Sequence, residues 1–236
     1  MARVTGMWVY QSLGDPPDPD AVAGRAARHG MRWITAEALV DGKVARQDWL
    51  RGMRRATRER GIRLGVHGFV GRPRPAPTAE AKTMSRAIDI ADADFAIVNA
   101  EKEYEEAPRP VSKQFVKAYR ALRPRFRTYF SSFGRPKFHP GLDWAAWADG
   151  GFRAMPQAYE NLNAELLKPR LCVEDYARFF ARDTMRPTLG CFAEHNQGHL
   201  PLTRLVASVR EVPQLTFNVY RHGTVTKAEL DALDGV

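Results

Sequence analysis

The chain has 236 residues, of which 44% are hydrophobic and 27% are charged. This balance is typical of a soluble globular protein and excludes a largely disordered chain. No apolar run approaches the roughly 18 residues of a membrane-spanning helix. The apolar stretch Met7–Tyr10 is too short for a signal peptide. We therefore expect cytoplasmic synthesis without an export signal, and no membrane partner.

The cysteine count and the net charge further limit the class of protein and the kind of partner. Cys172 and Cys191 are the only two cysteines, which excludes a disulfide-stapled scaffold and a cysteine-rich zinc site. The net charge of +9 favours an anionic partner. The densest basic run, residues 46–60, carries an apolar stripe at helical spacing, so we interpret it as the solvated face of a helix. No nucleic-acid-binding motif is present, and we expect no nucleic acid partner.

Short β-type runs alternate with helical patterns along the whole chain. The expected strands span 4–11, 31–38, 62–70, 94–101, 125–132, 152–159, 187–194 and 214–220. The expected helices lie between them at 18–30, 46–60, 78–91, 110–123, 143–150, 172–182 and 201–210, with a last helix starting at 226. Asp18 followed by Pro19 is a typical helix start, and Gly30 a typical helix end.

Eight strand–helix units in one chain predict a single (β/α)8 barrel, an α/β TIM barrel covering residues 1–236. Each unit has about 30 residues, the size of one βα repeat. An open doubly wound sheet is the competing architecture. It usually carries a glycine-rich turn after its first strand, and residues 12–17 contain no such turn.

Polar residues gather where the expected strands end, which is the functional face of such a barrel. The first three strands contribute Tyr10, Glu37 and His67, and the last contributes Tyr220. The complete set of candidate substrate-binding residues is Asn99, Gln157, Tyr159, Glu37, His67, Tyr10, Glu103 and Tyr220. A barrel that served only as a scaffold would not need these side chains at one rim.

The fourth strand carries the leading catalytic candidate, Glu101. Strand periodicity places Asn99 and Glu101 on the same side. A carboxyl group and an amide in a barrel mouth suit general acid/base catalysis, in which we expect the pKa of Glu101 to be raised. The alternative is that Glu101 begins a solvated acidic loop, and for Glu103 this alternative is the preferred interpretation.

Glu194, at the end of the seventh strand, is the candidate for a second catalytic carboxylate. Its alternative is a salt bridge to one of the many arginines at the rim. Gln157 and Tyr159 share a side of the sixth strand, and their alternative is packing against rim neighbours. His195 and His199 have a spacing that suits a metal on a helix, but the residues between them indicate a loop. We predict neither a metal site nor a cofactor.

Three short motifs carry a resemblance to a known class of protein. They are Asn99 to Tyr104, Ser131 to Gly134 with His139-Pro140, and Met155 to Tyr159. With them the chain resembles the glycoside-hydrolase-like TIM barrels of phages that infect actinobacteria. A looser likeness connects it to family 18 chitinases and family 25 lysozymes, which end the fourth strand in a DxE pair. This chain has Asn99 where the Asp of that pair would stand.

The resemblance implies a glycosidase that cleaves a bacterial cell-wall or surface polysaccharide, with Glu101 as general acid/base and Glu194 as nucleophile or base. If Glu194 points away, it implies a substrate-assisted route with Tyr159 as the orienting group. The alternative is a non-catalytic saccharide-binding or structural barrel of a phage virion, with virion components as partners and release on lysis. A third alternative is a metal-dependent hydrolase using His67, Glu194 and His195.

Overall fold

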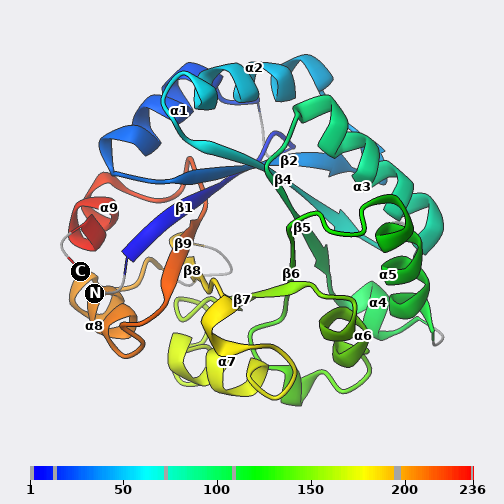
Figure 1. The fold of residues 1–236 in the computed structure, drawn as a ribbon. Coiled ribbons are helices and arrows are strands. Elements are labelled where there is room, and N and C mark those ends of the chain that lie inside the picture. The colour runs from blue at the N-terminus through cyan, green and yellow to red at the C-terminus, as the bar shows by residue number, and fades with distance from the viewer. Residues whose placement is uncertain (1–2, 13–14, 72–73, 108–109, 194–197, 235) are drawn as a thin grey trace.

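The computed structural model describes residues 3–12, 15–71, 74–107, 110–193, 198–234 and 236 as a closed parallel β-barrel inside a layer of helices (Figure 1). Because β1 pairs in parallel with both β2 and β9, the sheet closes on itself. This confirms the predicted (β/α)8 barrel. The barrel strands are β1 (Arg3–Val9), β2 (Trp33–Val40), β4 (Arg63–Val70), β5 (Phe95–Ala100), β6 (Thr128–Ser132), β7 (Arg153–Ala158), β8 (Thr188–Gly190) and β9 (Thr216–Tyr220).

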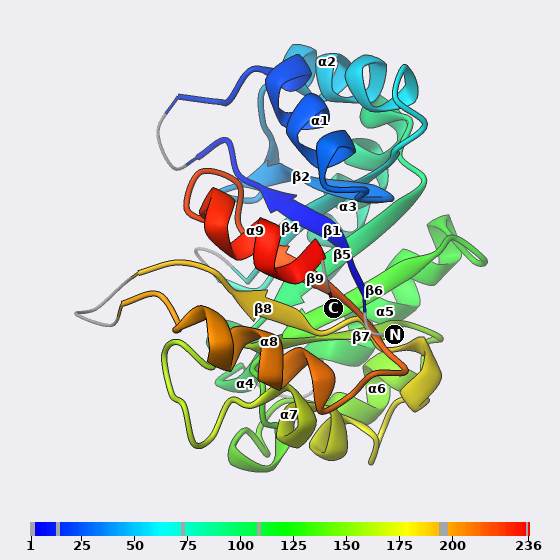
Figure 2. The ribbon, with the colours of Figure 1, turned by 90° about the vertical axis from the view of Figure 1, so that its left-hand side faces the viewer.

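Helices connect successive strands and cover the outside of the barrel (Figures 1 and 2). The cap predicted at Asp18 forms, with its side chain accepting an N–H from Ala21 at 3.0 Å. The helices are α1 (Pro19–Arg28), α2 (Gln47–Arg58), α3 (Pro77–Ala91), α4 (Lys102–Glu105), α5 (Val111–Leu122), α6 (Trp144–Asp149), α7 (Pro169–Tyr176), α8 (Leu202–Arg210) and α9 (Lys227–Asp234), with short 3-10 turns at Pro136–Phe138 and Arg182–Thr184.

The structure differs from the sequence prediction in several elements, among them the short helix α4, which was not predicted. A short strand, β3 (Lys43–Val44), pairs antiparallel with β2 and was not predicted. The helix expected at 172–182 begins earlier, at Pro169, because proline suits the first turn of a helix. The strand expected at 187–194 is limited to β8, Thr188–Gly190, and Glu194 lies outside the described residues.

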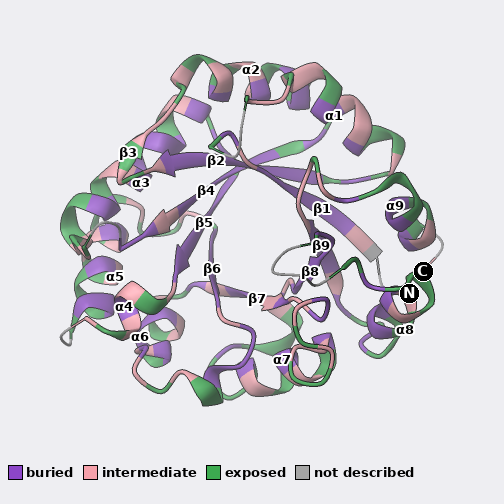
Figure 3. Ribbon diagram, turned by 180° about the vertical axis from the view of Figure 1, so that it is seen from behind, coloured by how far each residue is buried: buried purple, intermediate pink, exposed green. Residues whose placement is uncertain are grey.

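Two hydrophobic cores follow from the alternation of side chains along each strand. The larger core fills the space between the barrel and its helices, and on β5 it takes Ala96, Val98 and Ala100. The smaller core fills the barrel itself, with Trp8, Trp33, Phe95, Ile97, Tyr129 and Met155. The strands are consequently buried along most of their length (Figure 3).

Glycine on β4 makes room for the inner core. A Cβ placed on Gly65 would stand 2.2 Å from a ring carbon of Phe95, so no larger residue fits beside that ring. The Phe95 ring in turn packs edge-on against Trp33 and Tyr129, at centroid distances of 5.4 and 5.9 Å. These three rings form a layer across the barrel interior, close to the N-terminal ends of the strands.

The basic run on α2 is a solvated helix face, as predicted. Arg54 pairs with Asp92 and Asp94, at 3.0 and 2.8 Å, and Arg60 pairs with Asp20 at 3.0 Å. Acidic residues of neighbouring elements therefore neutralise much of this run. Among the described residues, no helix is both long enough and apolar enough to cross a membrane.

Candidate functional site at the C-terminal end of the barrel

Glu101, Asn99 and Gln157 form one hydrogen-bonded group at the C-terminal end of the barrel. Oε1 of Glu101 accepts an N–H from Asn99 at 3.0 Å and another from Gln157 at 2.7 Å. The Gln157 amide also donates to Oδ1 of Asn99 at 3.2 Å. The structure thus places Asn99 and Glu101 on one side, as strand periodicity predicts, and adds Gln157 from β7.

The two oxygens of Glu101 differ in their surroundings. Oε1 receives both amide donors, whereas Oε2 has no hydrogen-bond partner among the described residues. Glu101 is half-buried and directly follows β5, and α4 begins immediately after it. A proton on this carboxyl group would therefore be carried by Oε2, since Oε1 is already engaged as an acceptor.

Three tyrosines predicted as binding residues gather at the same end of the barrel. The Tyr220 ring, at the end of β9, lies 5.3 Å from the ring of Tyr10 and 5.3 Å from the ring of Tyr159. Phe192 packs edge-on against Tyr159 at 5.3 Å. We call Tyr10, Tyr159 and Tyr220 the tyrosine cluster. Tyr159 lies two residues beyond Gln157, so the cluster begins next to the residue that binds Glu101.

The tyrosine cluster is a neutral, amphipathic surface. Burial is the main cause that raises the pKa of Tyr10 well above its ordinary value, and the neighbouring Tyr220 and Tyr159 raise it further. The guanidinium of Arg221 lies over the rings of Tyr10 and Tyr220, 5.9 and 5.6 Å from their centroids. Sequence reasoning missed Arg221 and Phe192. For Arg221 the only available signal was its position just after the expected strand 214–220, whereas Phe192 lay inside the expected strand 187–194.

A cavity of about 270 Å³ lies on the same rim, beside Tyr10. It is lined by Tyr10, Asp15, Pro17, Arg221, His222, Gly223 and Thr224. The tyrosine cluster therefore extends from Tyr159, two residues after Gln157, to a hollow between the segments that follow β1 and β9.

Glu37 holds a loop in place. Oε2 of Glu37 accepts the backbone N–H groups of Gln11 and Ser12, at 3.0 and 2.8 Å, and Oε1 accepts the Ser12 hydroxyl at 2.9 Å. Strand β2 continues past Glu37 to Val40, so Glu37 does not end its strand as expected. Both of its oxygens are engaged in fixing the segment that follows β1.

His67 lies inside the barrel, within β4, and does not end its strand as expected. It is 2% exposed, and its ring packs against Trp8 and Tyr10 at centroid distances of 4.6 and 4.7 Å. Nδ1 lies 3.2 Å from the Thr35 hydroxyl. Burial lowers the pKa of His67 to about 3, so the imidazole is neutral at ordinary pH. In this position the neutral His67 ring packs against the Tyr10 ring from the interior of the barrel.

The remaining candidates have separate positions. Glu103 is half-buried on α4, two residues after Glu101 in sequence. Glu194 and His195 lie outside the described residues, so their roles stay predictions. His199 pairs with the buried Glu229 at 2.9 Å.

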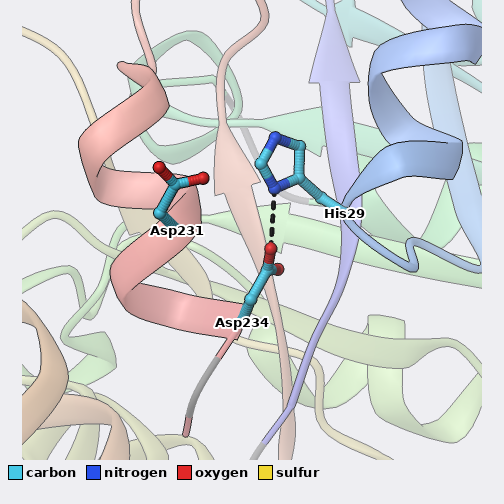
Figure 4. A group of neighbouring side chains, drawn as sticks. All are labelled: His29, Asp231 and Asp234. Carbon is cyan, nitrogen blue, oxygen red and sulfur yellow. Dashed lines mark hydrogen bonds and ion pairs between the residues drawn. The ribbon is translucent and has the colours of Figure 1, made fainter.

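One group of side chains in the described part of the chain has the spacing of metal ligands, and it lies far from this site in the fold. His29 follows α1, and Asp231 and Asp234 belong to α9, in the outer layer (Figure 4). His29 Nδ1 is already paired with Asp234 at 2.8 Å. The exposed aspartates offer no second feature that indicates an ion.

Comparison of the sequence with protein-family models and with curated proteins finds no match. Solved structures do match. Active domain 2 of a thermostable chitinase from Pyrococcus furiosus, complexed with chito-oligosaccharides, superposes with a TM-score of 0.71 at 12% identity. That match covers 99% of this chain and 94% of the chitinase chain.

Two further structures match over the whole chain. An endo-beta-N-acetylglucosaminidase from Cordyceps militaris gives a TM-score of 0.66 at 12% identity, over 100% of this chain and 90% of its own. The spore cortex-lytic enzyme SleL of Bacillus cereus gives 0.68 at 7% identity, over 99% and 74%. At such identities the likeness shows the fold alone. The predicted resemblance to glycoside hydrolase barrels is confirmed at that level, and the phage origin stays a prediction.

Proposed function

We propose that the chain is a glycosidase that cleaves a polysaccharide of the bacterial cell wall or cell surface, with Glu101 as the general acid/base. The observation that supports this most is the asymmetry of the Glu101 carboxyl group. Two amides fix Oε1, and Oε2 has no partner among the described residues. A carboxyl group held by one oxygen is oriented to exchange a proton through the other.

The tyrosine cluster fits a saccharide ligand. A sugar ring presents an apolar face and a hydroxyl edge, and Tyr159 and Tyr220 offer a ring surface and a polar atom in the same way. The chitinase, the glucosaminidase and SleL act, by their names, on chitin, on N-acetylglucosaminides and on spore cortex. We therefore place N-acetylhexosamine units in the proposed polysaccharide.

Two catalytic routes are compatible with Glu101 as the acid, and they differ in the second catalytic group. In the first, Glu194, which follows β8, acts as nucleophile or base. In the second, the acetamido group of the substrate attacks the anomeric carbon while Tyr159 orients it. Neither route requires a cofactor, because proton transfer and displacement at carbon supply the whole reaction.

The test is release of reducing ends from a panel of purified wall polysaccharides and chito-oligosaccharides, comparing the wild type with Glu101→Gln. Glutamine keeps an oxygen for both amide donors but cannot deliver a proton, so hydrolysis should fall by about 10²–10⁴-fold. Glu106→Gln, at an exposed position just after α4, is the matched control and should change the rate little. Equal rates for wild type and Glu101→Gln would remove Glu101 from the acid role.

Glu194→Gln then separates the two routes. A loss as large as that of Glu101→Gln supports the carboxylate nucleophile or base, whereas near-wild-type activity on N-acetylated substrates supports the substrate-assisted route. Saccharide binding by the wild type without any turnover would instead favour the non-catalytic saccharide-binding barrel.

A further inference from the structure

A second cavity lies at the opposite, N-terminal end of the barrel. Its volume is about 260 Å³, and the layer formed by Trp33, Phe95 and Tyr129 is its floor. Five arginines line it, and we call them the arginine ring. They are Arg32, Arg63, Arg127, Arg153 and Arg186.

Strand geometry explains how the ring forms. Arg63 begins β4 and Arg153 begins β7, each two residues before an inward-facing position, Gly65 and Met155. Arg127 stands in the same relation to Tyr129 on β6. Side chains two residues apart point to the same face of a strand. Arg63, Arg127 and Arg153 therefore converge on the barrel axis from three different strands, and Arg32 and Arg186 complete the lining of the cavity.

Within the described residues, no acidic side chain compensates the charges of the arginine ring. No ion pair joins Arg32, Arg63, Arg127, Arg153 or Arg186 to an acidic residue in the described part of the chain. Asp94, which directly precedes β5 and accepts the backbone N–H of Leu64 beside Arg63, is already bound by Arg54 at 2.8 Å. Arg186 bonds only to backbone carbonyls, those of Asp183 and Met185.

The arginine ring differs from α2 in how its positive charges are paired. The arginines of α2 form the densest basic run in the sequence, yet Asp20, Asp92 and Asp94 neutralise several of them. The arginines of the ring are dispersed in the sequence but concentrated in space, and the described residues offer them no such partners. Five cations around one cavity repel one another, a cost that a bound anion removes.

We propose that the arginine ring binds a compact anion carrying two or more phosphate groups. Guanidinium groups bind phosphate oxygens through paired N–H donors, and several of them around one cavity favour a multivalent ligand over a single phosphate. The cavity is below the usual size range for drug-sized ligands, so the ligand is small. Thr216 adds a buried hydroxyl on the cavity wall that has no hydrogen-bond partner in the part of the chain that the structure describes.

The site does not depend on the proposed glycosidase activity. The arginine ring and Glu101 lie at opposite ends of the barrel, with the aromatic layer between them. Binding can therefore be measured without any substrate. Failure of hydrolysis at Glu101 would leave this proposal unaffected, and failure of anion binding would leave the glycosidase proposal unaffected.

The test is isothermal titration of the full chain with tripolyphosphate near physiological salt, with thermal unfolding as a second measurement. We expect one tripolyphosphate per chain and a rise in Tm that saturates with ligand. The double variant Arg63→Gln/Arg153→Gln should weaken binding by at least about tenfold. The control Arg55→Gln/Arg58→Gln removes the same charge from α2 and should change affinity by less than about twofold.

Several results would overturn the proposal. They are equal weakening by both double variants, tighter binding of citrate or of single phosphate than of tripolyphosphate, and tighter binding of an oligonucleotide. A lack of saturable binding by the wild type would overturn it as well.

If Arg63→Gln/Arg153→Gln does not fold, Arg63→Lys/Arg153→Lys keeps the charge and loses the paired donors. It should still bind tripolyphosphate, more weakly than the wild type. Without ligand and at low salt, the Gln double variant should melt no lower than the α2 control, because it relieves repulsion. A markedly lower Tm would show that the ring is structural and would contradict the proposal.

Discussion

Gln157 on β7 reaches across the intervening strand β6 to donate a 2.7 Å hydrogen bond to Glu101, just beyond β5. The space for this bond comes from Ser131, the small residue of β6 that lies in register with Asn99. A larger side chain at this inward position would separate the amide from the carboxyl group. The orientation of the proposed acid therefore depends on three consecutive strands.

Replacing Gln157 tests that orientation. A hydrogen bond to a charged group is worth about 1.5–3 kcal/mol, so Gln157→Leu should lower kcat/KM by about 10–100-fold. Asn99 still holds Oε1 in this variant, which is why the loss should be smaller than that of Glu101→Gln. Steady-state kinetics on the best polysaccharide measures it. The control Gln114→Leu, on the exposed face of α5, should leave the rate unchanged.

The sequence predicted the barrel and the Asn99–Glu101 pair because both depend on local periodicity. The eight strand–helix alternations and the spacing of two on β5 are visible without tertiary information. The depth of His67 was not visible, since burial along a strand depends on where its neighbours end. The hydrogen bonds of Glu37 to the segment after β1 depend on a loop conformation, which the residue types alone do not specify.

The arginine ring shows the same limit. Arg32, Arg63 and Arg153 are dispersed along the chain, and only barrel closure brings them together. Sequence inspection instead drew attention to the contiguous basic run of α2, which neighbouring acids partly neutralise. Linear charge density is thus a poor guide to spatial charge density in a closed barrel.

Spectroscopic titration should find at least four of the seven tyrosines un-ionised in the folded protein at about pH 11. Burial raises the pKa of Tyr119 to about 12, and raises those of Tyr10, Tyr104 and Tyr176 above their ordinary value. The unfolded chain loses these protons first, so stability should decrease as pH rises above about 10.

Ultraviolet absorbance of tyrosinate measures this directly. The same protein in concentrated guanidinium chloride is the control and should titrate all seven tyrosines together. Complete ionisation at pH 11 with the circular dichroism of the folded state intact would contradict the burial of these side chains.

Gly65→Ala should destabilise the barrel by about 1–3 kcal/mol, because the added methyl group would meet the Phe95 ring. For a domain of this size, each kcal/mol shifts Tm by roughly 2–4 °C. The matched control is Gly24→Ala in α1, where the nearest neighbour of an added Cβ is 3.6 Å away, at the flexible end of Arg28. Alanine is the better helix former, so that control should be neutral or stabilising.

A double substitution identifies the cause of the Gly65→Ala effect. Phe95→Leu alone leaves a cavity, whereas in the Gly65→Ala background it makes room for the added methyl group. The two changes should therefore cost less together than the sum of their separate costs. Simple additivity in thermal unfolding would show that the clash with Phe95 is not the source of the loss.

The stability of the protein in acid should depend on His67. The folded-state pKa of His67 is lowered to about 3, against about 6.5 in the unfolded chain. Between these values the unfolded chain binds more protons, so the free energy of unfolding should decrease as pH falls from about 6.5 towards 3. His67→Gln removes this titration and should give a flatter curve over that range. His222, whose pKa burial lowers to about 4, adds a smaller slope of the same sign in both proteins.

Urea unfolding at intervals from about pH 3.5 to 8 measures the difference. Above about pH 7 the two proteins should differ by a constant, which reports the packing of His67 against Trp8 and Tyr10. Parallel curves over the whole range would place the imidazole in contact with water and contradict its position inside the barrel.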